Sequence, residues 1–172
     1  MSRRKYAIIM AAGSGSRMGA ELPKQFLQMN GKAILQNTIE VFLNAVPGIK
    51  VITVLPEDYI EYWKKYCLGM NFTCTQVLVK GGITRFHSVK NALAKVPDGA
   101  LVAVHDGVRP LVTSSFLAGM FAKAEAVEEA PKAEGIQGLD SELPTQKEIE
   151  KEVAKDEGPI VPVDAEGVSK NG

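Results

Sequence analysis

The sequence has 172 residues, of which 45% are hydrophobic and 23% are charged, and its formal net charge is zero. This length suits one domain with a sizeable core, and no apolar run approaches the length of a membrane span. Because no long apolar segment with a cleavage site follows the basic start, we expect neither a secretory signal nor a membrane protein. Cys67 and Cys74 lack metal-ligand spacing, which favours reduced thiols and a cytoplasmic location.

The zero net charge hides a division near residue 126. Residues 1–126 hold 15 Lys/Arg and 8 Asp/Glu, whereas residues 127–172 hold 5 and 12 and contain no Phe, Trp or Tyr. A basic body suits an anionic substrate, and an acidic stretch without aromatic residues is typical of poorly packed chain. We therefore expect an α/β domain over 1–126 and an acidic tail of uncertain structure over 127–172.

Strand-like and helix-like segments alternate along the body. The expected elements, in chain order, are a strand over 6–10, a helix over 34–43, a strand over 51–55, a helix over 58–66, a strand over 76–79, a helix over 85–96, a strand over 101–104 and a helix over 114–127 capped by Thr113 or Ser114. This alternation predicts an α/β fold in three layers, a mostly parallel sheet with helices on both faces. Helical spacing places Phe86, Val89 and Leu93 on one face of their helix.

Three chemically distinctive segments follow strand ends. They are residues 11–19, 81–85 and 105–110. Ligands of parallel sheets bind beyond the carboxyl ends of the strands, so these loops are expected to form one site.

The first loop, with Gly13, Gly15, Arg17 and the nearby Lys24, has the composition of a phosphate cradle. Its glycine spacing fits neither the dinucleotide fingerprint nor the Walker loop. An ordinary glycine–serine turn beside solvated cations is the structural alternative.

Asp106 stands where a ligand of nucleotide-bound Mg²⁺ would stand, although it could instead cap a turn or pair with Arg109. Gly81-Gly82 could approach a nucleobase closely, with Ser88 adding a hydroxyl, or could form an ordinary turn. Fixed cations and Mg²⁺ suit attack on an α-phosphate, which needs no covalent nucleophile from the protein.

Four motifs occur in order: Ala11-Ala12-Gly13-x-Gly15-x-Arg17-Met18, Pro23-Lys24-Gln25, Gly81-Gly82-x-x-Arg85 and Val104-His105-Asp106-x-x-Arg109-Pro110. Together they resemble the 2-C-methyl-D-erythritol 4-phosphate cytidylyltransferases of the non-mevalonate isoprenoid pathway. The first motif alone is typical of sugar nucleotidyltransferases in general, and the combination is specific. The resemblance covers about residues 5–126 and implies a Rossmann-like nucleotidyltransferase fold.

This resemblance implies transfer of a cytidylyl group from CTP to methylerythritol phosphate, a small phosphorylated alcohol, with release of pyrophosphate and with Mg²⁺ as cofactor. It implies catalytic roles for Arg17 and Lys24 at the α-phosphate, a metal role for Asp106 and site support from Arg109. The implied nucleotide-binding residues are Ala11, Ala12, Gly13, Ser14, Gly15, Gly81, Gly82, Arg85 and Ser88. It implies no nucleic-acid or membrane partner, and a homodimer.

Residues 127–172 depart from the family pattern, so the C-terminal part of the fold is atypical or incomplete. The family continues with an apolar strand, an arm exchanged between subunits, a Thr-Pro-Gln segment and a distal catalytic lysine. Residues 159–164 resemble that strand only weakly, and the other three elements have no counterpart. Two alternatives to the transferase therefore stay open, a CTP-binding module or truncated variant without turnover, and a different sugar- or alcohol-phosphate nucleotidyltransferase.

Overall fold

The computed structural model describes residues 2–13 and 22–127. Contacts divide the chain into two units, Met1–Gly135 and Ile136–Gly172, of which the second lies outside the described residues. No helix within 2–13 and 22–127 is long and apolar enough to cross a membrane.

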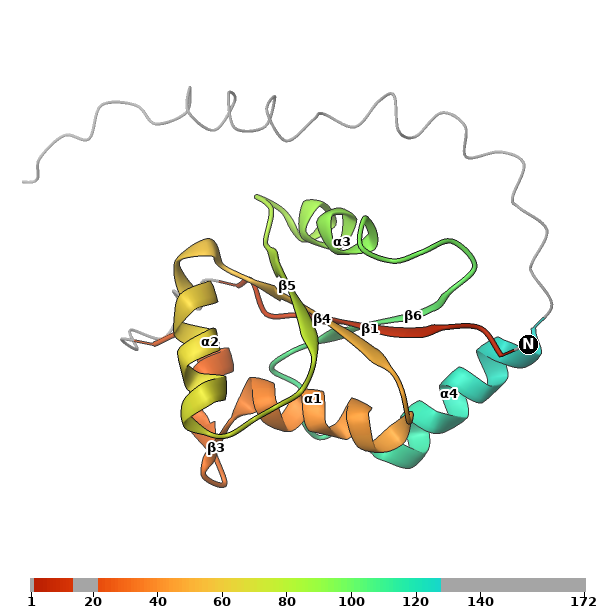
Figure 1. Ribbon diagram of the computed structural model, residues 1–172, viewed down its shortest axis with the longest axis horizontal. Helices are drawn as coiled ribbons and strands as arrows, with labels where there is room; N and C mark the ends of the chain where they lie inside the picture. The colour runs from red at the N-terminus through yellow and green to blue at the C-terminus, as the bar shows by residue number, and fades with distance from the viewer. Residues whose placement is uncertain (1, 14–21, 128–172) are drawn as a thin grey trace, which may run out of the picture. The chain divides into compact units, whose positions relative to one another are not determined.

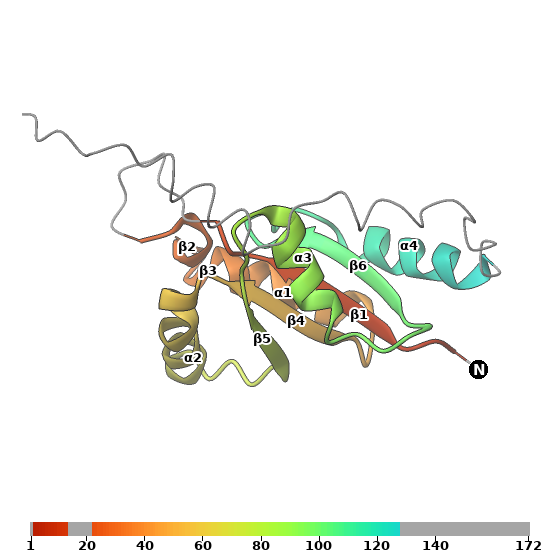
Figure 2. The same cartoon turned by 90° about the horizontal axis from the view of Figure 1, so that it is seen from above.

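Four parallel strands form the central sheet of the first unit (Figure 1). They are β1 (Lys5–Met10), β4 (Lys50–Leu55), β5 (Gln76–Lys80) and β6 (Leu101–Asp106). Their order is β5-β4-β1-β6, which can be followed in Figure 2. All four carboxyl ends therefore meet at one edge of the sheet.

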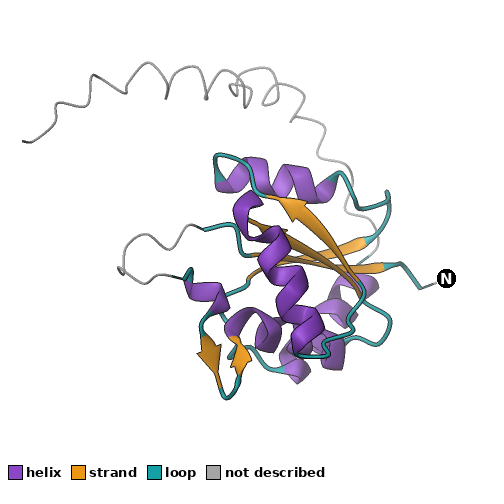
Figure 3. Cartoon of the chain, turned by 60° about the vertical axis from the view of Figure 1, so that its left-hand side comes forward, coloured by secondary structure: helices purple, strands orange, loops and turns teal. Residues whose placement is uncertain are grey.

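Helices cover both faces of this sheet, as the alternating pattern predicts (Figures 1 and 3). They are α1 (Ile34–Ala45), α2 (Ile60–Gly69), α3 (Arg85–Leu93) and α4 (Ser114–Ala126). The alternation of β1 divides the core, because Ala7 and Ile9 pack in the cluster that includes residues of α1, α2 and α4, whereas Ile8 and Met10 pack in the cluster that includes residues of α3. Two apolar layers thus hold the sheet in place.

Most predicted elements are present with small shifts at their ends. The helix predicted over 58–66 begins as a 3₁₀ turn, η3 (Glu57–Tyr59), and continues as α2. Of the two candidate caps for α4, the structure uses Thr113, whose hydroxyl accepts a hydrogen bond from the Phe116 N–H.

The sequence pattern missed three short elements between β1 and α1. They are the 3₁₀ turn η2 (Lys24–Phe26) and the antiparallel pair β2 (Gln28–Met29) and β3 (Lys32–Ala33). Asn30 and Gly31 form the turn of this hairpin with φ values of 55° and 77°. Asn-Gly is the preferred sequence for such a turn, but strands of two residues are too short to show an alternating pattern.

The buried face of α3 differs from the predicted one. Phe86 and Leu93 are 50% and 44% exposed, while the buried residues are His87, Ser88 and Ala92. Thr84 caps the helix by accepting a hydrogen bond from the His87 N–H, and its hydroxyl also lies 2.7 Å from His87 Nδ1. Of the predicted face, Val89 packs against the cluster that contains Ala92, so apolar contacts and the polar contacts of Thr84 and His87 together orient the helix.

Candidate active site

Three loops meet at the carboxyl edge of the sheet, and each continues the hydrogen bonding of its strand. The N–H groups of Ala11, Gly81 and Gly107 donate to the carbonyl oxygens of Val54, Leu55 and Met10 at 2.9, 2.8 and 2.7 Å. The loops thus leave the sheet from fixed starting points.

A cavity of about 480 Å³ opens between the loop after β1 and the loop after β5, and we call it the edge cavity. It is lined by Met10, Ala12, Gly13, Gly82, Ile83, Thr84, Arg85 and Ser88. Its volume falls in the range of small-molecule sites. Five of the residues predicted to bind a nucleotide therefore share one cavity.

Gly81 and Gly82 form the closest contacts of this cavity. A Cβ atom at Gly81 would lie 2.5 Å from Ala12 Cβ, and one at Gly82 would lie 2.4 Å from His87 Cβ. The Gly82 N–H donates to Ser88 Oγ at 2.9 Å. Glycine is needed here because the two loops and α3 approach within contact distance, and the Ser88 oxygen supports the loop backbone.

Gln25 anchors the loop after β1, a role that the sequence pattern did not assign. Its side chain is 3% exposed, and Nε2 donates to the carbonyl oxygens of Ala11 at 2.8 Å and Gly13 at 3.1 Å. Pro23 and Phe26 are also buried, whereas Lys24 is exposed. The residues around Lys24 are therefore buried, while the ammonium group of Lys24 stays accessible. The sequence indicated Gln25 only through its place in the motif Pro23-Lys24-Gln25.

Gly107 packs the third loop against the first, and this contact was also missed. A Cβ atom there would lie 2.9 Å from Leu35 Cδ1 and 3.1 Å from Ala11 Cβ. The carbonyl oxygen of Gly107 accepts a hydrogen bond from the buried Thr38 hydroxyl at 2.8 Å. The only sequence signal was a glycine next to Asp106.

Asp106 is held between two guanidinium groups. Arg85 Nη1 lies 2.8 Å from Oδ1, and Arg109 Nε donates to Oδ2 at 2.9 Å. Burial opposes ionisation of this carboxyl, but hydrogen bonds and charge from Arg85, and then from Arg109, outweigh it and lower the pKa of Asp106 below its usual value. The carboxylate is therefore charged at neutral pH, and the expected alternative of pairing with Arg109 is present.

As a magnesium ligand, Asp106 would act as a single carboxylate. Among the described residues no group of three or more His, Cys, Asp or Glu could hold a metal ion. Nucleotide-bound Mg²⁺ is commonly held by one or two carboxylates together with the phosphates, so this donor fits such an ion and not a metal held by protein alone. Ser14, Gly15 and Arg17 lie outside the described residues.

The model of the family described as IspD: 2-C-methyl-D-erythritol 4-phosphate cytidylyltransferase matches residues 6–137. The chain belongs to this family. It is 47% identical to the enzyme of that name from Porphyromonas gingivalis over 125 residues, 73% of this chain and 55% of that protein. It is 48% identical to the one from Azobacteroides pseudotrichonymphae over 123 residues, 72% of this chain and 55% of that protein. The chain thus spans about half the length of the curated relatives it matches.

Solved structures agree with this family assignment. The 4-diphosphocytidyl-2C-methyl-D-erythritol synthase of Anaerococcus prevotii matches with a TM-score of 0.59 and 26% identity, over 72% of this chain and 52% of that one. The bifunctional IspDF of Campylobacter jejuni matches with a TM-score of 0.60 and 25% identity, over 71% of this chain and 31% of that one. The predicted fold class is confirmed, and the recognised family is the right one.

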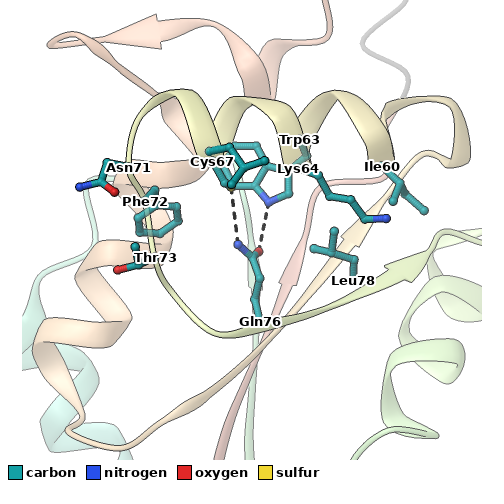
Figure 4. A pocket seen from close by; sticks show the side chains of 10 residues that line it. Ile60, Trp63, Lys64, Cys67, Asn71, Phe72, Thr73, Gln76 and Leu78 are labelled. Carbon is teal, nitrogen blue, oxygen red and sulfur yellow. Dashed lines mark hydrogen bonds between the residues drawn. The ribbon is translucent and has the colours of Figure 1, made fainter.

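A larger cavity of about 690 Å³ lies between α2 and β5 (Figure 4), and we call it the α2–β5 cavity. Its centre is Gln76, whose Oε1 accepts hydrogen bonds from Thr53 Oγ1 at 2.6 Å and Trp63 Nε1 at 3.1 Å. Gln76 Nε2 donates to Cys67 Sγ at 3.8 Å, and burial raises the pKa of the Cys67 thiol to about 11. Because these polar atoms bond to one another, this cavity has the character of core rather than of a reaction site.

Proposed function

We propose that this chain binds CTP with Mg²⁺ at the carboxyl edge of its sheet, and that it transfers the cytidylyl group to 2-C-methyl-D-erythritol 4-phosphate. The observation that carries the proposal is the edge cavity, where the first and second motif loops line one volume and Arg85 pairs with Asp106 of the third. Membership in the cytidylyltransferase family supports the choice of CTP over other nucleotides.

In this proposal the loop after β1 receives the triphosphate. The backbone N–H groups of residues 11–15 would face the phosphate oxygens. Gln25 would bind the carbonyl groups of Ala11 and Gly13 and so keep them directed away from the phosphates. The Gly81-Gly82 backbone and the Ser88 hydroxyl would face the cytosine ring. The tight contacts at both glycines hold this backbone against Ala12 and His87, so its position beside the base would be fixed.

The reaction itself would be an in-line displacement. A phosphate oxygen of the acceptor attacks the α-phosphorus, a new P–O bond forms, and the bond to the β-phosphate oxygen breaks as pyrophosphate leaves with its electron pair. Arg17 and Lys24 would stabilise the negative charge that grows on the α-phosphate, and Arg109 would orient Asp106. Bound Mg²⁺ would supply further charge neutralisation at the phosphates, with Asp106 as its protein ligand.

A CTP-binding module without turnover is the second candidate. The observation that favours it is that the similarity covers only 55% of the curated relatives and does not extend over the acidic residues near the end of the sequence. The family's acceptor arm and distal lysine have no counterpart in residues 127–172. A nucleotidyltransferase with another phosphorylated acceptor is the third candidate, and the family match speaks against it.

Two measurements separate these candidates. Calorimetry with CTP and Mg²⁺ tests binding, and a pyrophosphate-release assay with and without methylerythritol phosphate tests turnover. Acceptor-dependent release supports the transferase, and binding without release supports the module. Failure of the wild-type chain to bind CTP would contradict both.

The remaining parts of the proposal concern organisation. We assign nucleotide binding to residues 1–126 and leave the acidic residues 127–172 without a catalytic role. Both cysteines are free thiols, which suits a reducing cytoplasmic location. A homodimer is the family's expected state, and sedimentation of the full chain would test it.

A further inference from the structure

The ion pair between Arg85 and Asp106 joins the two sides of the site. Arg85 begins α3 after β5, and Asp106 ends β6. Among residues 2–13 and 22–127 these strands are the first and last in the order of the sheet, with β4 and β1 between them. The pair therefore passes across the carboxyl ends of β4 and β1, where the loop after β1 begins.

The two arginines that hold Asp106 are not equivalent. Arg109 lies three residues away in the same turn, and its backbone is fixed because its N–H donates to the Asp106 carbonyl at 3.2 Å and its own carbonyl lies 2.9 Å from His105 Nε2. Arg85 comes from another loop and also lines the edge cavity. Both side chains are exposed, Arg85 at 63% and Arg109 at 73%, so both pairs are of the weak, solvent-screened kind. What separates the two arginines is that Arg109 is also tied to Asp106 through its backbone.

We propose that Arg85 changes partner when the nucleotide binds, a step that rests on the proposed CTP function. In the structure its guanidinium pairs with Asp106, and on nucleotide binding it moves to the triphosphate. A multiply charged phosphate chain competes well for an exposed guanidinium that already borders its cavity. The exchange breaks the contact between Arg85 and Asp106 Oδ1, while Arg109 keeps its hydrogen bond to Oδ2.

In this exchange the Asp106 carboxylate and the nucleotide phosphates compete for the Arg85 guanidinium. CTP must displace the carboxylate from Arg85 before it gains that contact, so the Arg85–Asp106 pair lowers the affinity for the nucleotide. The competition can be measured without metal, because it concerns only side chains of this chain and the phosphates.

Calorimetric titration of CTP in EDTA tests the exchange with four proteins: wild type, Asp106→Asn, Arg85→Gln and the double variant. We expect Asp106→Asn to tighten metal-free CTP binding by roughly two- to fivefold, the scale of an exposed ion pair, because it releases Arg85. Arg85→Gln should weaken binding by a similar factor. In the double variant most of the gain from Asp106→Asn should disappear, since the released partner is missing.

The test depends on whether the effects of Asp106→Asn and Arg85→Gln on CTP affinity are additive. If Asp106→Asn tightens binding equally with and without Arg85, the carboxylate acts by simple repulsion and the exchange is wrong. Glu61→Gln removes an exposed carboxylate paired with Lys64 outside the edge cavity and should leave CTP affinity unchanged. Absence of CTP binding by wild type with or without Mg²⁺ would overturn the proposed function itself.

A spectroscopic measurement on wild type does not depend on the variants folding well. NMR signals of the Arg85 Nε–H and the Asp106 carboxyl carbon should both shift when saturating CTP is added in EDTA, and the Arg109 Nε–H signal should shift less. Unmoved Arg85 and Asp106 signals at saturation would overturn the exchange.

Discussion

The edge cavity and the α2–β5 cavity differ in what their polar atoms do. In the α2–β5 cavity the Gln76 amide joins Thr53, Trp63 and Cys67 in one closed set of hydrogen bonds. In the edge cavity two glycines, Gly13 and Gly82, lie among the lining residues together with the exposed Arg85. Volume therefore does not mark the candidate site. The edge cavity is distinguished because residues of two predicted motif loops line it.

Trp63→Ala should give the largest effect and should affect stability alone. The indole is fully buried and stacks on Tyr66 with ring centroids 5.1 Å apart. Its removal should lower the free energy of unfolding by about 3–5 kcal/mol. Urea denaturation measures the loss, and CTP affinity measured below the unfolding transition should stay unchanged. A large loss of affinity in the folded variant would mean that the two cavities are coupled.

Gly82→Ala should damage the edge cavity and its stability together. The added Cβ would meet His87 Cβ at 2.4 Å, so α3 must move away from the cavity wall, at a cost of about 1–3 kcal/mol for overpacking. We expect CTP affinity to fall at least about tenfold, equal to 1.4 kcal/mol. Gly69→Ala is the matched control at the end of α2, because a Cβ there meets no atom within 4 Å. Equal CTP affinity in the two variants would show that the wall at Gly82 does not contact the nucleotide.

The sequence predicted the features that repeat along the chain. Alternating strands and helices defined the three layers, and loops after parallel strands had to meet at one edge, as Ala12, Gly82 and Asp106 do. Contacts between residues far apart in the sequence could not be predicted from this repeating pattern. The hydrogen bonds of Gln25 to the first loop and the partner of Arg85 depend on tertiary packing. On α3, apolar spacing correctly placed Val89 toward the core but not the polar pair Thr84 and His87.

Lys24→Ala should slow turnover without destabilising the protein. The side chain is exposed between the buried Pro23 and Gln25, so its loss should change stability by no more than about 0.5 kcal/mol. If the chain turns over, removal of a cation that stabilises the transition state should lower kcat at least about tenfold, or 1.4 kcal/mol of barrier. Lys64→Ala, beside the α2–β5 cavity, is the control and should keep the wild-type rate. An unchanged rate for Lys24→Ala would remove this lysine from the catalytic role.

Alkylation of Cys67 is the smallest perturbation, and it probes the α2–β5 cavity without changing any residue that lines it. Burial disfavours the thiolate and raises the pKa of Cys67 from 9.0 to about 11, so the thiol is neutral at pH 7. Only the thiolate is alkylated, and its fraction should rise about tenfold per pH unit until the pH approaches 11. The iodoacetamide reaction of Cys67, followed by mass spectrometry in a Cys74→Ser background, should therefore accelerate steadily from pH 7 to pH 10. A rate that levels off near pH 8 would mean that the thiol is activated, and the α2–β5 cavity would then be a second reactive site rather than part of the core.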